Sequence, residues 1–146
     1  KTEFVGKSAK YILDKIGITV GDDVKVILME AKEDHPFVQV ELMMPILPLV
    51  RVPDVDQAIE MAVRVEHGNR HTAMMHSRNV EKLTKMAKLI QTTIFVKNGP
   101  SYAGIGVGGE GYTTFTIAGP TGEGLTSAKS FARRRRCVLV GGMDVR

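Results

Sequence analysis

Residues 53–96 read PDVDQAIEMAVRVEHGNRHTAMMHSRNVEKLTKMAKLIQTTIFV, and this stretch decides the fold class. Asp54 follows a proline and stands three positions before Gln57, which is the spacing of a capping box at the start of a helix. Apolar residues then recur at helical spacing until Gly68, where this helical unit is expected to end. A second capped helix with a similar apolar stripe is predicted to begin near Asn79.

Short apolar and β-branched runs around these helices are typical of buried strands. Four strands are predicted, at 24–29, 46–52, 72–76 and 92–96. Pro48 weakens the second of them or places it at a strand end. A further helix is expected from Ala9 to Ile16, with Gly17 following it. Strands and helices alternate in this order, so we expect an α/β, three-layer domain with a largely parallel sheet. Nothing indicates a linker, and residues 1–146 are expected to form a single domain.

After Val96 the character of the chain changes. Residues 99–124 hold nine glycines and two prolines, and so long a loop region in a compact domain is usually functional. A P-loop would need Gly-Lys-Ser/Thr where Glu110 stands, and a dinucleotide fingerprint should follow a first strand and open a helix. A loop that faces substrate or another subunit is therefore favoured over a phosphate cradle. Beyond it we expect a short strand within 112–117, a short helix near 126–131 and a last strand at 137–140.

Glu41 is the only charged residue between His35 and Pro45. Two interpretations are open from the residues alone. The carboxylate is paired in the core, or it accepts hydrogen bonds from the hydroxyl groups of a ligand.

Other residues that could carry chemistry have plainer interpretations. The histidines are His35, His67, His71 and His76. His67 and His71 lie four apart, but Gly68 breaks the helix that would align them, so structural roles are favoured over a metal site. Ser101 and Ser127 lack the context of a nucleophile elbow.

The four arginines at 133–136 have few aromatic residues around them, so an exposed segment is favoured over a nucleic-acid surface. Such a segment could pair with acidic groups of another subunit. Cys137 begins the predicted last strand without a base beside it in sequence, so a buried structural cysteine is favoured over a nucleophile.

Composition excludes several classes of protein. The net charge is +4, which permits an anionic ligand but does not require nucleic acid. A single cysteine cannot form an internal disulfide and fits a reducing compartment. No apolar run approaches the roughly 20 residues of a membrane span. The chain begins at Lys1 with no initiator methionine or signal peptide, so we expect a piece of a longer protein.

Several separated runs of the sequence resemble one branch of the aldehyde dehydrogenase superfamily. These runs are 35–45, 66–73, 94–100, 106–111, 120–124 and 135–139. The branch is the CoA-acylating propionaldehyde and acetaldehyde dehydrogenases of propanediol and ethanolamine breakdown. The resemblance implies the C-terminal part of the catalytic domain, which lacks both the nucleophilic cysteine and the dinucleotide-binding domain, and it gives Cys137 no catalytic role.

The superfamily motif Glu-Ile-Phe-Gly-Pro is similar to Glu41-Leu42-Met43-Met44-Pro45. The resemblance implies that Glu41 hydrogen-bonds the nicotinamide-side ribose of NAD, and it makes Glu41 the single predicted cofactor-binding residue. Met43 departs from the family, which has an aromatic residue there. No catalytic residue and no metal ligand is expected within this chain.

The implied parent enzyme converts a short-chain aldehyde, CoA and NAD to acyl-CoA and NADH, with CoA as a substrate. It is a homo-oligomer without nucleic-acid or membrane partners, and it is cytoplasmic or inside a bacterial microcompartment. The isolated piece is expected to be inactive. Two other hypotheses are a non-catalytic nucleotide- or acyl-CoA-binding module and a purely structural domain.

Overall fold

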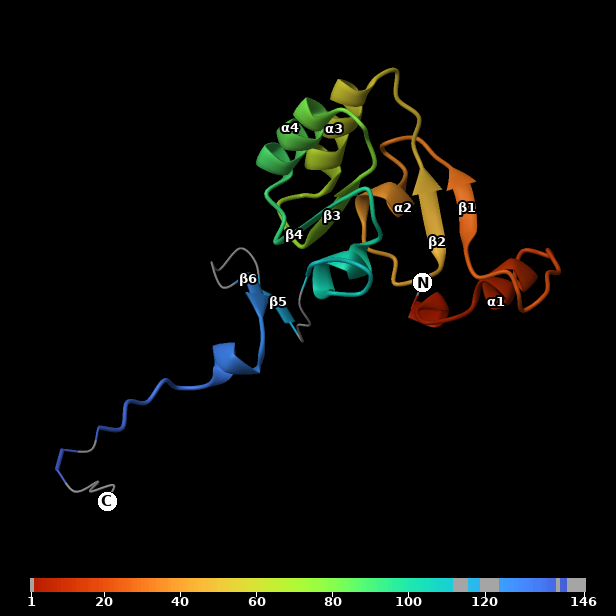
Figure 1. Ribbon diagram of the computed structural model, residues 1–146. Helices are drawn as coiled ribbons and strands as arrows, with labels where there is room; N and C mark the ends of the chain where they lie inside the picture. The colour runs from red at the N-terminus through yellow and green to blue at the C-terminus, as the bar shows by residue number, and fades with distance from the viewer. Residues whose placement is uncertain (1, 112–115, 119–123, 139, 142–146) are drawn as a thin grey trace. The chain divides into compact units, whose positions relative to one another are not determined.

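The computed structural model describes residues 2–111, 116–118, 124–138 and 140–141, and its fold class is α/β as predicted (Figure 1). The chain falls into two compact units. The first comprises Lys1–Gly68 and Arg78–Ile90, and the second comprises Asn69–Ser77 and Gln91–Arg146. The single domain expected over residues 1–146 stays a prediction.

The first unit contains a pair of parallel strands, β1 (Ile27–Glu30) and β2 (Ile46–Leu49). Pro48 lies inside β2, opposite Met29. The Ile27 N–H of β1 donates to the carbonyl of Pro45, just before β2, and the Ala31 N–H, just after β1, donates to the carbonyl of Leu49. A parallel ladder uses alternate residues of each strand, so Pro48 occupies a position where the ladder requires no N–H donor.

Capping residues stand at the start of the two long helices of the first unit. The helices are α1 (Ala9–Asp14), α2 (Pro36–Gln39), α3 (Val55–Val65) and α4 (Val80–Ile90), and a 3-10 turn, η1, covers Thr2–Phe4. Asp54 caps α3 by accepting a hydrogen bond of 2.9 Å from the Gln57 N–H. The Gln57 amide bonds to the Asp54 carboxylate, not to its backbone N–H, so the predicted capping box is half formed. Asn79 caps α4 through the Lys82 N–H.

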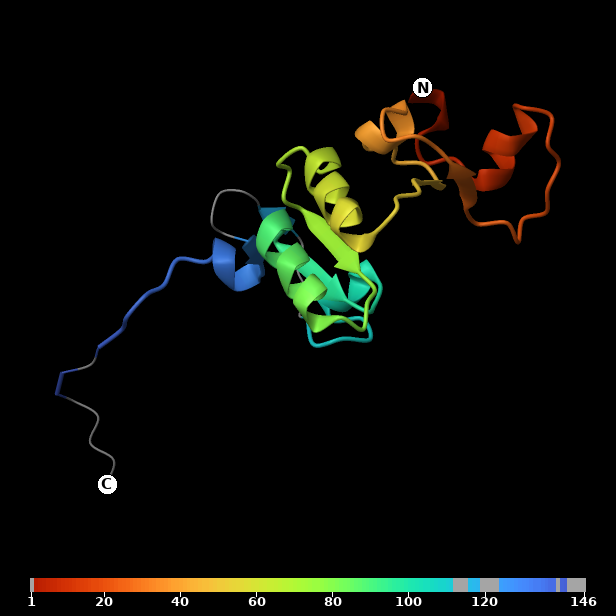
Figure 2. The same cartoon turned by 90° about the horizontal axis from the view of Figure 1, so that it is seen from above.

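Helices α3 and α4 pack side by side in the first unit (Figures 1 and 2). Their apolar stripes supply its core. Ile59 of α3 is 2% exposed, and Leu83, Met86 and Ile90 of α4 are all buried. Burial of such side chains stabilises the fold by about 1.5–3 kcal/mol each relative to full exposure.

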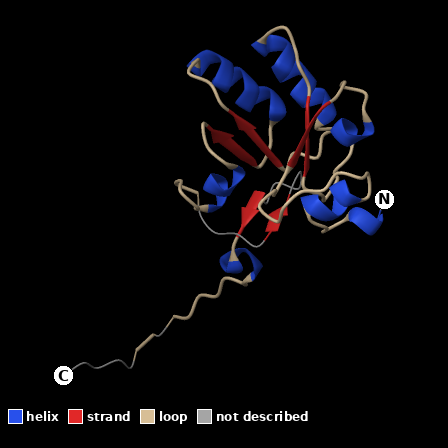
Figure 3. Cartoon of the chain, turned by 90° about the vertical axis from the view of Figure 1, so that its right-hand side faces the viewer, coloured by secondary structure: helices blue, strands red, loops and turns tan. Residues whose placement is uncertain are grey.

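The second unit contains the parallel strands β3 (Thr72–Met75) and β4 (Ile94–Lys97), in register from Thr72 opposite Ile94. A 3-10 turn, η2 (Ser101–Ile105), follows β4 (Figure 3). Beyond it lie an antiparallel pair, β5 (Thr116–Ala118) with β6 (Gly124–Thr126), and a last 3-10 turn, η3 (Ala128–Phe131).

The predicted order of strands and helices is confirmed, with shifted boundaries. The first helix ends at Asp14, and α2 adds a short helix that was not predicted. The predicted strand at 112–117 lies partly outside the described residues. The predicted last strand is wrong, because the described residues 137, 138 and 140 are not in a strand. A strand needs a hydrogen-bonded neighbour, and none of the described residues supplies one here.

No described helix combines the length and apolar character that crossing a membrane demands.

Candidate cofactor-binding site

Glu41 lies on the segment that joins α2 to β2, and its side chain is exposed. The preceding residue, Val40, is extended, with φ −130° and ψ 148°. A carboxylate paired in the core would be buried, so that interpretation of Glu41 is wrong. The other interpretation stays a prediction, in which Glu41 accepts hydrogen bonds from the hydroxyl groups of a ligand.

The segment after Glu41 is held in an unusual backbone conformation at Met43. Its φ is 52°, in the left-handed region that non-glycine residues seldom adopt. The Met43 carbonyl accepts a hydrogen bond of 3.1 Å from the Gly6 N–H, which ties this segment to the stretch before α1. The Met43 side chain is 66% exposed. A strained, exposed apolar residue two positions after Glu41 is consistent with a ligand-contacting surface.

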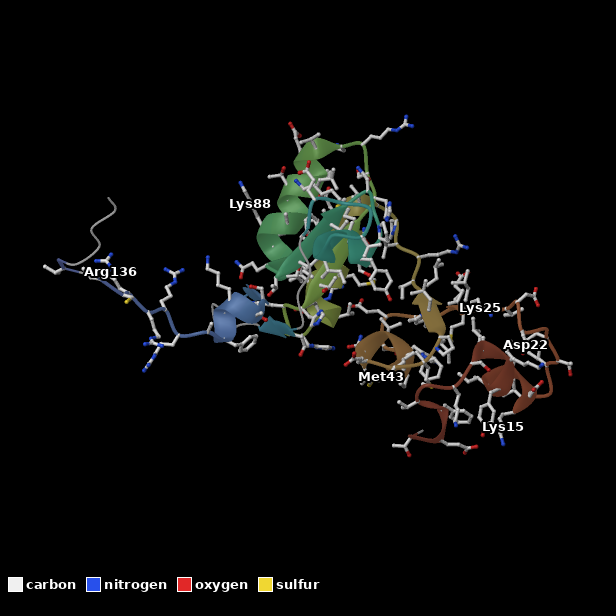
Figure 4. The ribbon with its side chains drawn as sticks, turned by 60° about the horizontal axis from the view of Figure 1, so that its bottom comes forward. Lys15, Asp22, Lys25, Met43, Lys88 and Arg136 are labelled. Carbon is white, nitrogen blue, oxygen red and sulfur yellow. The ribbon has the colours of Figure 1, made fainter. Side chains whose placement is uncertain are left out.

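A hollow of about 600 Å³ adjoins this segment and lies within the first unit. It extends from Met43, Met44 and Pro45 to the residues before and at the start of α1, and to the loop before β1. Figure 4 shows Asp22 and Lys25 on that loop, with Met43 on the segment that leads into β2.

The hollow is basic, because its lining includes Lys7, Lys10 and Lys25 and only one carboxylate, Asp22. The Lys10 ammonium lies 3.2 Å from the Asp22 carboxylate, and the Lys25 ammonium donates to the Asp22 backbone carbonyl at 2.5 Å. The Lys7 ammonium lies 5.5 Å from the ring centroid of Tyr11. Three lysines against one aspartate suit an anionic ligand, such as one that bears phosphate groups.

The glycine-rich loop forms a second hollow, of about 570 Å³, within the second unit. The turn is tightly wound. A Cβ on Gly104 would lie 2.3 Å from the Ile94 side chain, and one on Gly111 would lie 2.3 Å from the Gly104 backbone. The N–H groups of Val107 and Gly111 bond to carbonyls inside the loop. Those two amides are therefore engaged in holding the loop, and this supports the expectation that the loop is no phosphate cradle.

The histidines have structural partners, or stand at the surface in the case of His76. His35 caps α2, because its Nδ1 accepts a hydrogen bond of 3.1 Å from the Phe37 N–H. His67 Nε2 lies 2.9 Å from Gln39 Oε1, and His71 Nδ1 lies 2.7 Å from the Thr72 hydroxyl. Across the described residues, the potential metal ligands form no group of three or more.

The arginines at 133–136 are exposed, as predicted, and Arg136 lies on an extended stretch after η3 (Figure 4). Cys137 is exposed, so the expected burial of its thiol is wrong. The physical reason is the missing strand, since without a paired neighbour nothing covers this side chain in the described chain.

The sequence alone did not predict the basic hollow. Lys7 and Lys10 come from one end of the chain and Lys25 from a separate loop, and no spacing rule links them to Met43. The link is a backbone hydrogen bond from Gly6 to Met43, which leaves no trace in side-chain patterns. The signals available for this region were the lone charge of Glu41 in an apolar stretch and the family motif that begins with it.

The model of the aldehyde dehydrogenase family matches residues 25–123. A curated relative, propanal dehydrogenase (CoA-propanoylating) from Citrobacter freundii, is 56% identical over 99% of this chain and 32% of its own length. The chain thus spans about a third of the length of the curated relatives it matches. The predicted resemblance to CoA-acylating aldehyde dehydrogenases is confirmed.

Solved structures agree with this. An engineered glycolyl-CoA reductase with bound NADP+ has a TM-score of 0.88 and 72% identity, and the match covers 100% of this chain and 33% of that one. A propionaldehyde dehydrogenase from the fucose utilisation bacterial microcompartment of Clostridium phytofermentans has a TM-score of 0.86 and 53% identity, covering 100% and 34%. The chain belongs to the aldehyde dehydrogenase family.

Proposed function

We propose that this chain is the C-terminal part of the catalytic domain of a CoA-acylating aldehyde dehydrogenase. The whole enzyme would convert a short-chain aldehyde, CoA and NAD to acyl-CoA and NADH. The support is the match to CoA-propanoylating and glycolyl-CoA enzymes over the full length of this chain. Since the chain spans a third of those relatives, the reactive cysteine and the dinucleotide-binding domain would come from the rest of the enzyme.

The observation that carries the role of this chain is the exposed Glu41, two residues before a basic hollow that begins at Met43. The residues present fit a nicotinamide dinucleotide. Glu41 offers carboxylate oxygens to ribose hydroxyls, and Lys7 and Lys10 offer positive charge to phosphates. When bound, the nicotinamide accepts a hydride. Glu41 would orient the ribose, and Met43 would present a flexible apolar surface where relatives have an aromatic ring.

The glycine-rich loop would form part of the aldehyde-facing wall in the second unit. Its backbone approaches itself too closely for side chains at Gly104 and Gly111, so the wall has a fixed shape. We infer that the enzyme works as a homo-oligomer, in the cytoplasm or inside a bacterial microcompartment. The microcompartment origin of one structural neighbour supports the second location.

The test is NADH formation from propionaldehyde by the intact gene product, with and without CoA. Glu41→Gln should raise the KM for NAD by about 10- to 100-fold, because hydrogen bonds to charged groups contribute about 1.5–3 kcal/mol. Glu30→Gln is the matched control, since Glu30 is also an exposed carboxylate of the first unit and pairs with Arg51 at 3.0 Å.

A KM for NAD that Glu41→Gln leaves unchanged would remove Glu41 from the site. CoA-independent turnover would contradict the acylating reaction. Isolated residues 1–146 should form no NADH. If the intact protein forms none from any short aldehyde but binds NAD or acyl-CoA, a non-catalytic binding module becomes the better function.

A further inference from the structure

The Gln39 side-chain amide, two residues before Glu41, joins three parts of the first unit. Its Nε2 donates a hydrogen bond of 2.5 Å to the Glu33 backbone carbonyl. Its Oε1 lies 2.9 Å from His67 Nε2, which comes from the turn after α3. The last residue of α2 is therefore linked to the chain before α2 and to the end of α3.

The geometry fixes the direction of both bonds. A backbone carbonyl only accepts, so the Gln39 amide must turn its NH2 group toward Glu33. Its carbonyl oxygen then faces His67 and can only accept, so His67 Nε2 is the donor. Both the neutral Nε2–H tautomer and the imidazolium of His67 satisfy this arrangement.

An ion pair keeps both ends of this link in place. The Arg64 guanidinium donates to the two Glu33 carboxylate oxygens, at 2.9 Å and 3.1 Å. This bidentate ion pair lowers the pKa of Glu33, chiefly through the hydrogen bonds from Arg64. Arg64 lies in the last turn of α3, and His67 follows that helix at φ 55°. The Glu33–Arg64 ion pair and the amide link therefore join the stretch from Glu33 to Gln39 to the end of α3 at two points.

Hydrogen bonds hold the chain on both sides of Glu41. Before it, Gln39 is held by Glu33 and His67. After it, Met43 is held by the Gly6 N–H. The intervening chain is short, so fixing both flanks limits where the exposed carboxylate can lie.

We propose that Gln39 is a positioning residue for cofactor binding, acting with His67 to hold Glu41 where it meets the ribose. This rests on the proposed function of Glu41. Gln39 makes no contact with the cofactor in this role. Its loss should weaken cofactor binding because Glu41 then samples positions that do not reach the ribose.

The test uses the intact enzyme with Gln39→Ala, His67→Ala and the double variant. Each single variant should raise the KM for NAD about tenfold, the equivalent of one lost hydrogen bond, while kcat changes less than twofold. The double variant should be no worse than either single one, because the two residues act through one link. His67→Gln keeps a donor and should restore most of the affinity.

Arg51→Gln is the matched control, because it removes an exposed ion pair of the same unit that does not touch α2. Its KM for NAD should equal that of wild type. A merely structural role for Gln39 would lower the melting temperature and leave the KM unchanged, and this result would overturn the proposal. Additive effects in the double variant would also contradict it. If wild-type enzyme forms no NADH, the proposed function itself fails, which is a distinguishable outcome.

Discussion

Two loop segments of this chain are fixed in different ways. The segment around Glu41 is held by partners far away in sequence, since His67 bonds to Gln39 across 28 positions. The glycine-rich loop after β4 is held from within, by backbone bonds such as those from Val107 to Tyr102 and from Gly111 to Ala103. The first segment depends on particular side chains, and the second depends on the absence of side chains.

This difference predicts different sensitivities to mutation. A side-chain link fails when one donor or acceptor is removed, at a cost near that of one hydrogen bond. A tightly wound glycine turn has no room for an added atom. Substitutions to alanine should therefore be mild in the segment around Glu41 and severe at the closely packed glycines of the loop, such as Gly111.

The largest effect is expected for Gly111→Ala. Its Cβ would lie 2.3 Å from the Gly104 carbonyl carbon and oxygen, and backbone atoms cannot rotate away. Overpacking of this kind costs about 3 kcal/mol, which should appear as a lowered midpoint of urea unfolding. Gly108→Ala is the control, because its Cβ meets nothing within 4 Å and only its φ of 71° is unfavourable, a cost of about 1 kcal/mol. Equal losses from the two variants would contradict close packing as the cause.

A smaller effect is expected where the glycine-rich loop begins, at Asn98. Its side chain accepts from the Ser77 N–H at 2.7 Å and donates to the Ser77 carbonyl at 2.9 Å, joining the ends of β3 and β4. Asn98→Ala should cost about 2 kcal/mol, from two hydrogen bonds of about 1 kcal/mol each. Asn98→Asp keeps the acceptor and loses the donor, so its loss should be about half. Unchanged unfolding midpoints in both variants would show that the two strand ends do not depend on this link.

Short sequence patterns predicted the parts of the fold that depend on interactions between residues close in sequence. Asp54 and Asn79 cap α3 and α4 as their spacing indicated. The strand expected at Cys137 failed because strands depend on a neighbour that local sequence does not specify. The link between Gln39 and His67 was missed for a related reason, since it joins residues 28 positions apart. Glu41 was singled out as the only charge in its stretch and by the family motif, and its role stays a prediction, while the basic hollow that begins at Met43 required the folded chain.

The smallest effect concerns how α3, which carries Arg64, is fixed to α4. The Asp56 carboxylate of α3 lies 2.6 Å from the Lys82 ammonium and 2.7 Å from that of Lys85. The hydrogen bonds from Lys82 and then Lys85 lower the pKa of Asp56 from 3.8 to about 2. A carboxyl group with a lowered folded-state pKa contributes stability that is complete above pH 3.8 and is lost as the pH falls toward 2.

Wild-type protein should therefore lose stability in this window, and Asp56→Asn should show a smaller loss in urea unfolding at pH 5 and pH 3. Because the Asp56, Lys82 and Lys85 side chains are only part-buried, the difference should be small and should shrink in high salt. Lys88→Met, also on α4 (Figure 4), should keep the wild-type pH dependence. If Asp56→Asn follows the wild-type curve, the Asp56 ion pairs contribute no pH-dependent stability, and the packing of α3 against α4 depends on their apolar faces.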